Sequence, residues 1–138
     1  MPLRSARPAF ILIFILLMAF RFAAEAADNT AWIKANHPYA LLESDTIDLG
    51  VLAQGNRASG QIRLTNQGSG ELLIARVRSS CGLMTPAWPD KGIRTGKEAV
   101  IGFRYDTRRL GPFTRKVIIH TNAWQRTLVL TVIGEVVP

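Results

Sequence analysis

Apolar and polar residues alternate at a spacing of two along most of this chain, which is typical of β-strands with one buried face. The alternating segments are bounded by clusters of Gly, Asn, Asp and Pro, which favour turns. The predicted strands cover residues 40–43, 46–52, 58–66, 71–78, 99–106, 113–121 and 126–136. Val77 is out of phase with Ile74, so the pattern predicts a β-bulge near Ala75 or Arg76.

About seven short strands without helical periodicity predict an all-β fold. Such strands bury their inner faces when two sheets pack together, which favours a single immunoglobulin-like antiparallel β-sandwich. A chain of 138 residues has room for one domain of this kind. Its core is expected to contain Ile62, Leu64, Ile74, Ile101, Phe103, Val117, Ile119, Leu128 and Leu130.

The first 26 residues have the pattern of an export signal. Arg4 and Arg7 precede an apolar run over residues 9–20, and Ala24-Glu25-Ala26 has the small residues that signal peptidases accept. We expect a helical signal peptide over 1–26, because the run is shorter than the ~20 apolar residues that cross a bilayer. The alternative is an uncleaved inner-membrane anchor with the domain outside the cytoplasm. Both interpretations predict a periplasmic or secreted domain.

The segment that follows, residues 27–39, shows no sustained periodicity and is interpreted as a mobile linker before a domain over 40–138. Without residues 1–26 the chain has 14 basic and 9 acidic residues, a net charge of +5. This charge favours an envelope protein or an acidic envelope surface as the partner, and it also promotes solubility. Nucleic acid is not expected to be a partner of an exported domain.

Five short patterns occur in a characteristic order within the predicted domain. They are Ile47-Asp48-Leu49-Gly50, Leu64-Thr65-Asn66-Gln67-Gly68, Ser80-Cys81-Gly82, Ile93-Arg94-Thr95-Gly96, and Gly111-Pro112-Phe113 leading to Thr121-Asn122. From about Asp45 to Val136 the chain thereby resembles the bacterial family called domain of unknown function 1573. Such domains are similar to the immunoglobulin-like folds of periplasmic pilus chaperones and of ciliary and spindle proteins. The resemblance implies an exported β-sandwich with no established reaction.

Cys81 and Gly82 belong to a motif that commonly reads Cys-Gly-Cys-Thr in that family, whereas Leu83 and Met84 follow here. A lone thiol can neither close a local disulfide nor chelate a metal alone. We therefore expect Cys81 to be a small packed residue, because free cysteines are often buried. A thiol carrier, or a copper carrier using Cys81 with Met84, is the minor alternative.

No constellation in the sequence favours catalysis, so the protein is not expected to be an enzyme. Nucleophile elbows, phosphate-binding loops and zinc-protease motifs are absent from the sequence. His37 and His120 lack a ligand-like companion at helical or hairpin spacing, and no metal or other cofactor is expected.

The connection over residues 79–97 is the most distinctive stretch outside the predicted strands. Long loops on rigid β scaffolds commonly carry binding sites, which makes Met84, Trp88 and Lys91 candidate contacts. Trp88 could instead cover an open end of the core. Arg108 and Arg109 are candidate contacts that would mainly assist the encounter with a partner.

The leading hypothesis is therefore an exported, non-catalytic interaction module of the cell envelope whose partner is unknown. The alternative is a structural or chaperone-like subunit of an envelope assembly, which holds strands of its partner. The two differ in whether a loop or a free sheet edge forms the interface.

Overall fold

The computed structural model describes residues 13, 15, 30–80 and 84–138. The chain divides into two compact units, Met1–Ile33 and Lys34–Pro138, and the second contains the sandwich. The predicted signal peptide lies almost entirely outside the described residues and stays a prediction. Among the residues that are described, no helix has the length and apolar character needed to cross a bilayer.

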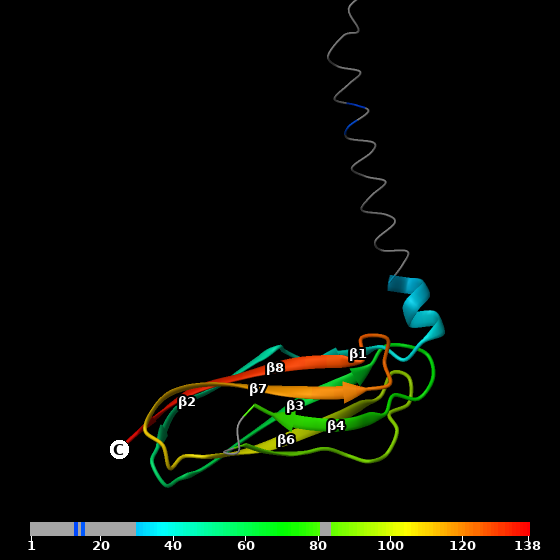
Figure 1. Ribbon diagram of the computed structural model, residues 1–138. Coiled ribbons are helices and arrows are strands. Elements are labelled where there is room, and N and C mark those ends of the chain that lie inside the picture. Colours follow the sequence, from blue (N-terminus) through cyan, green and yellow to red (C-terminus); the bar gives the residue numbers. More distant parts are fainter. Residues whose placement is uncertain (1–12, 14, 16–29, 81–83) are drawn as a thin grey trace, which may run out of the picture. The chain divides into compact units, whose positions relative to one another are not determined.

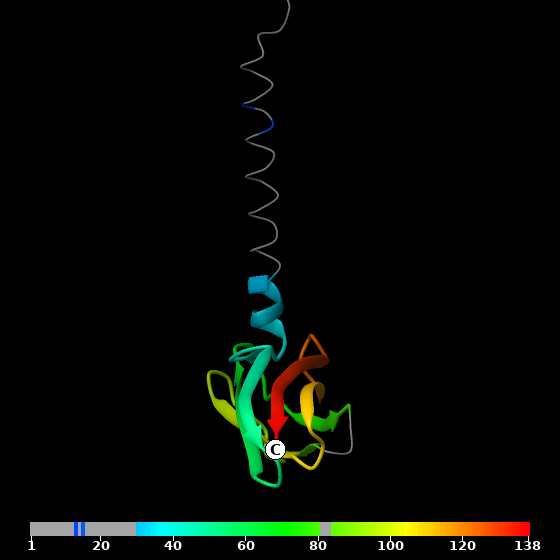
Figure 2. The same cartoon turned by 90° about the vertical axis from the view of Figure 1, so that its left-hand side faces the viewer.

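The second unit is a β-sandwich of two four-stranded sheets, which confirms the predicted fold class (Figures 1 and 2). The first sheet has the order β1-β3-β6-β5, and the second has the order β2-β8-β7-β4. The strands are β1 (Ala40–Leu42), β2 (Thr46–Ala53), β3 (Arg57–Asn66), β4 (Ile74–Ser79), β5 (Met84–Ala87), β6 (Glu98–Asp106), β7 (Gly111–Thr121) and β8 (Thr127–Val137). The paired strands are antiparallel except for β2 and β8, which are parallel. The chain passes from the first sheet to the second between β1 and β2.

The core lies between the two sheets and is filled by the alternating positions that the sequence identifies. All of the predicted core residues are buried except Leu128, which is partly buried and packs against the core. The two sheets also meet through aromatic rings, because Tyr105 of β6 stacks on Phe113 of β7 with centroids 4.0 Å apart. Burial of these apolar side chains is the main driving force for the fold.

The predicted irregularity in the fourth strand is present. The register between β4 and β7 shifts between Ile74 and Arg76, which confirms the β-bulge expected there. The strand begins later than predicted, because Leu72 forms an isolated bridge with Ile93 instead of pairing with β7. The backbone of Leu73 is bound by Asn122, whose Oδ1 accepts the Leu73 N–H at 2.7 Å.

The expected long loop over residues 79–97 contains a strand that the sequence analysis missed. Strand β5 pairs with β6, with Met84 opposite Tyr105 and Ala87 opposite Gly102. It was missed because it is short and contains Pro86, a residue that is normally read against a strand.

The expected linker over residues 27–39 also contains regular structure. Residues 30–36 form a helix, which ends before Pro38 because a proline disfavours helical geometry in the residue before it. Backbone hydrogen bonds then attach the entering chain to the sandwich: Ser69 N–H donates to Lys34 O at 2.8 Å and Gln67 N–H donates to Tyr39 O at 2.8 Å. The compact unit consequently begins at Lys34, before the predicted domain start at residue 40.

Candidate functional site

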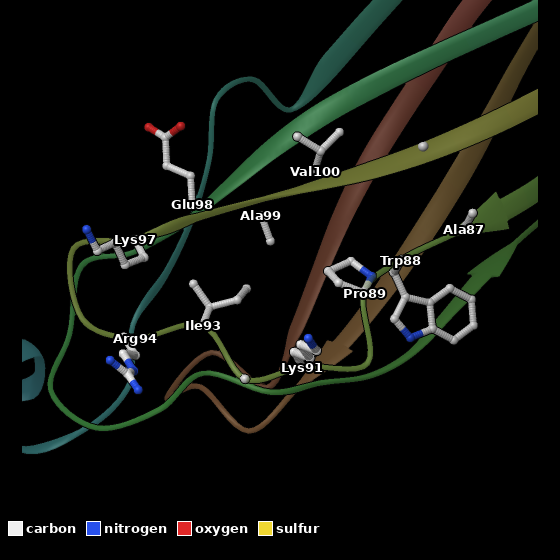
Figure 3. Close-up of a pocket in the computed structure, with 12 residues that line it drawn as sticks. Ala87, Trp88, Pro89, Lys91, Ile93, Arg94, Lys97, Glu98, Ala99 and Val100 are labelled. Atoms are coloured by element: carbon white, nitrogen blue, oxygen red, sulfur yellow. The ribbon is translucent and has the colours of Figure 1, made fainter.

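A groove opens beside β6 where β5 ends. After Ala87 the chain leaves the sheet, and Ile93 is held by two backbone hydrogen bonds with Leu72, of 2.7 and 2.9 Å. Strand β6 extends beyond this point from Gly102 back to Glu98. The space between β6 and the departing chain is an open groove of about 670 Å³ (Figure 3).

One part of the groove lining is apolar, and Trp88 is its largest side chain (Figure 3). Trp88 is 37% exposed and does not belong to the buried core cluster. Val100 of β6 is 46% exposed. The other apolar lining residues are Ala87, Pro89, Ile93 and Ala99. Trp88 thus lies at the groove and outside the core cluster, and its role as a contact residue stays a prediction.

The charged part of the lining is mostly basic. It contains Lys91, Arg94 and Lys97 against the single acid Glu98. All four side chains are exposed, and within the described part of the chain none of them forms an ion pair. The groove therefore combines an exposed aromatic ring with cations that are available to an acidic ligand.

The turn that carries two of these cations is fixed by the buried side chain of Asn66. Its Nδ2 donates to Ile93 O at 2.9 Å and to Gly70 O at 2.8 Å, while its Oδ1 accepts the Gly68 N–H at 3.0 Å. Its backbone bonds the same turn, since Asn66 N–H donates to Lys97 O at 3.0 Å. Asn66 thus gives a physical reason for the Thr65-Asn66-Gln67-Gly68 pattern, because it joins residues 66–70 to the turn between Ile93 and Lys97.

The remaining predicted contacts lie elsewhere. Met84 is opposite Tyr105, and Arg108 and Arg109 follow the far end of β6. The groove lining reaches Gly102 of β6, and at about 3.3 Å per residue the rest of the strand to Asp106 is about 13 Å long. The structure therefore brings Trp88 and Lys91 together but does not bring Arg108 or Arg109 to them.

Arg108 is already engaged within its own turn. Its Nη2 lies 2.5 Å from Asp106 Oδ2, and its Nε donates to the same oxygen at 2.6 Å. The hydrogen bond from Arg108 lowers the pKa of the Asp106 carboxyl below its ordinary value, and it raises the pKa of Arg108. Arg109 is exposed in the same turn.

Cys81 and Gly82 lie outside the described residues, so the packing role expected for Cys81 stays a prediction. The ring of His37 lies 5.0 Å from that of Trp124, and His120 Nδ1 lies 3.5 Å from Thr127 Oγ1. Across residues 30–80 and 84–138, no three His, Cys, Asp or Glu side chains gather closely enough to hold a metal ion.

Sequence reasoning missed Arg94, Lys97 and Val100 as lining residues. The signal that could have found the first two is the run of cations from Lys91 to Lys97 around the Ile93-Arg94-Thr95-Gly96 pattern. Val100 carries no charge, and its alternation with the buried Ile101 places its side chain on the outer face of the sheet, where it is 46% exposed.

Solved structures of similar fold come from several kinds of organism. A protein of unknown function from Porphyromonas gingivalis W83 has a TM-score of 0.64 at 20% identity, over 71% of this chain and 46% of that one. The chain thus spans less than half of that protein's length. A PapD-like domain of human CEP192 has a TM-score of 0.60 at 9% identity, over 71% of this chain and 84% of that one. For WR4, a Caenorhabditis elegans MSP family member, the TM-score is 0.53 at 12% identity, over 71% and 99%.

These structural likenesses, all at low identity, establish the fold alone. No curated protein matches the chain by sequence. The family model described as a protein of unknown function, DUF1573, matches residues 41–136, which include every strand that lines the groove. The chain belongs to the DUF1573 family.

Proposed function

We propose that this protein is an exported, non-catalytic interaction module that binds its partner at the groove beside β6. The single observation that carries the proposal is that one open groove is lined by a partly exposed Trp88 and by three cations that form no ion pair within the described residues. Tryptophan is prominent among residues that dominate binding energy, because its large ring loses little conformational entropy when it is ordered. The cations would accelerate the encounter with an acidic partner.

The chaperone-like alternative receives less support from the outer edges of the sheets. Strand β5 has only four residues and contains Pro86, while β4 has a bulge and exposed Arg76 and Arg78. Short length, proline, bulges and charge all discourage the addition of a strand at an edge. These features favour recognition inside the groove over broad pairing along β4 or β5, and the edge strand β2 is likewise interrupted by a register shift between Asp48 and Val51.

Export rests on the pattern of the first 26 residues. The proposal expects the intact mass of the native protein to place its N-terminus at or near Ala27, with the domain in the periplasmic or secreted fraction. Recovery of the full-length chain from membranes would establish the anchored alternative, and recovery from the cytoplasm would contradict export.

The binding site is tested by affinity purification from the native cell envelope with matched tryptophan variants. Trp88→Ala should weaken capture of the partner by roughly 2 kcal/mol, about thirtyfold, while the domain stays folded. Trp124→Ala is the control, since Trp124 is 51% exposed and lines a different hollow with His37. Equal capture by both variants and the unchanged protein, or unfolding of Trp88→Ala, would refute the assignment of the groove.

A further inference from the structure

The direction of the backbone groups along β6 can be read from its pairing with β3. In an antiparallel pair, hydrogen-bonded and non-hydrogen-bonded residues alternate. The bond from Asn66 N–H to Lys97 O, at 3.0 Å, sets the phase of this alternation. The register then continues without a shift as far as the pair Arg57 and Asp106. The backbone groups of Ala99 therefore bond to β3, whereas the backbone N–H and C=O of Val100 point to the side of β6 away from β3.

That other side of β6 is only partly covered. Strand β5 reaches no further than Ala87, which is opposite Gly102. Among the strands of the described residues, none pairs with Glu98–Ile101 on this side. The backbone groups of Val100 therefore face the groove without a partner strand, although such groups are strong hydrogen-bonding groups.

The outer edge of β5 differs from this recessed edge. The same alternation pairs Thr85 with Arg104 and Ala87 with Gly102 as the bonded residues, which turns Pro86 outward. Because proline has no N–H, the outer edge lacks a donor at its centre. A strand can be added more readily inside the groove, beside Val100, than outside β5.

We propose that the groove accepts an extended acidic segment of a partner protein as a short added strand beside β6. This inference rests on the proposed function and names the partner chemistry of the same site. Main-chain hydrogen bonds to Val100 would supply affinity, and alternate side chains would supply specificity. Acidic side chains on one face of the segment would meet Lys91, Arg94 and Lys97, whereas apolar ones would meet Trp88.

A peptide fits these observations better than a lipid headgroup or an acidic polysaccharide. All three could satisfy the cations of the lining. Only a polypeptide backbone offers donors and acceptors at the spacing of a β-strand, which is what an unpaired strand edge requires. The charge of the lining and the direction of the Val100 backbone thus favour the same occupant.

The experiment uses the mature protein and a fluorescein-labelled peptide of sequence Glu-Val-Glu-Val-Glu. Binding is measured by fluorescence anisotropy, and the amide signal of Val100 is followed by NMR. Of two further peptides, one carries N-methyl groups on both valines and the other carries them on the third and fifth residues, which are glutamates. Each peptide therefore lacks the N–H donors of one edge of the strand and keeps those of the other edge. We expect one methylated peptide to bind at least about tenfold more weakly than the parent and the other to bind within about twofold.

Protein variants give an independent reading. Val100→Pro removes the N–H that faces the groove while leaving the bonds of Ala99 toward β3, and Val100→Thr is the matched control that keeps this N–H. The first should weaken binding about tenfold, and the second should leave it nearly unchanged. Should Val100→Pro fail to fold, the pair of methylated peptides still decides the question with the unaltered protein.

Several outcomes would overturn the inference. They are the absence of saturable binding, equal affinity for both methylated peptides, and equal competition by polygalacturonate or by vesicles of phosphatidylglycerol and phosphatidylcholine. Partner capture that depends on Trp88 but is indifferent to Val100→Pro would refute strand addition and leave the groove as the binding site. If Trp88→Ala captured the partner as well as the unaltered protein does, the proposed function itself would be refuted.

Discussion

The turn held by Asn66 and the groove beside β6 are neighbours, but the polar side chain of the turn is buried and hydrogen-bonded whereas the charged side chains of the groove are exposed. The Asn66 side chain is fully buried and its amide bonds Gly68, Gly70 and Ile93. On the other side of the same turn, the cations of the groove stay exposed and unpaired within the described residues. The hydrogen-bonded turn stabilises the fold, whereas the exposed cations of the groove are available to bind a partner.

The largest effect that tests this contrast is expected from Asn66→Ala. The substitution removes the donor to Gly70 O and the acceptor of the buried Gly68 N–H, while Ile93 O keeps its bond from the Leu72 N–H, so the free energy of unfolding should fall by about 3 kcal/mol. Urea unfolding measures this loss. Gln67→Ala is the control, because the side chain of Gln67 is exposed and accepts a bond from Lys34 Nζ at 3.1 Å, while its backbone bond to Tyr39 is kept. This substitution should cost about 0.5 kcal/mol or less. Similar costs for both would show that the buried amide is not what fixes the turn.

A smaller loss is expected from Gly68→Ala. A Cβ at Gly68 would collide with His37 O and Tyr39 N, which are backbone atoms of the entering chain and cannot move aside as a flexible side chain could. The free energy of unfolding should fall by about 2 kcal/mol, the usual scale of overpacking. Gly102→Ala is a suitable comparison, since the nearest atom to its Cβ would be Gly60 O at 4.0 Å. Greater damage from Gly102→Ala than from Gly68→Ala would contradict this account of the turn.

Substitutions in the groove should change partner binding more than stability, whereas substitutions in the turn should mainly change stability. Replacing Lys91 and Lys97 together by Gln should change the free energy of unfolding by only about 0.5 kcal/mol, because exposed unpaired charges contribute little to stability. The association rate with the partner should nevertheless fall several-fold and lose part of its dependence on salt. Stopped-flow or surface-based kinetics at two salt concentrations would measure this.

The matching replacement at the other end of β6 is Arg108 and Arg109 by Gln. If that pair slows association more than the Lys91 and Lys97 pair does, the partner approaches the far end of the strand and the groove is not the point of encounter.

Most strands could be predicted, because their apolar and polar residues alternate in phase with their burial. Val117 and Ile119, for example, face inward both by the alternation of the sequence and by their burial. The bulge near Arg76 is also visible in the sequence, as a change in the phase of the alternation. Strand β5 was not predictable, because four residues that include Pro86 carry too little alternation to outweigh a strand breaker.

The candidate site was only half predictable for a related reason. Trp88 and Lys91 are conspicuous by residue type within a long connection. The groove itself depends on where β5 stops and on the bridge between Leu72 and Ile93, which joins positions far apart in the sequence. Pairing of this kind is a tertiary property, and no local pattern encodes it.

The smallest effect is expected at Asp106, where the contrast between paired and unpaired charge can be sharpened by pH. Its pKa is lowered by the hydrogen bond from Arg108. A carboxyl group whose pKa is lower in the folded state contributes stability above its unfolded pKa of about 3.9, and the contribution is lost as the pH falls through the folded pKa. The Arg108 side chain is 79% exposed, so solvent screening keeps this contribution small.

In Arg108→Gln, an NMR titration should therefore show the Asp106 pKa rising toward its ordinary value, because the ion pair that favours the carboxylate is gone. The urea midpoint at neutral pH should scarcely change, since an exposed pair contributes little. Arg109→Gln is the control and should leave the Asp106 pKa where it is. An Asp106 pKa that does not respond to Arg108→Gln would mean that Arg108 is unpaired in solution. The far end of β6 would then offer free cations as the groove does, and the difference between the two basic regions would disappear.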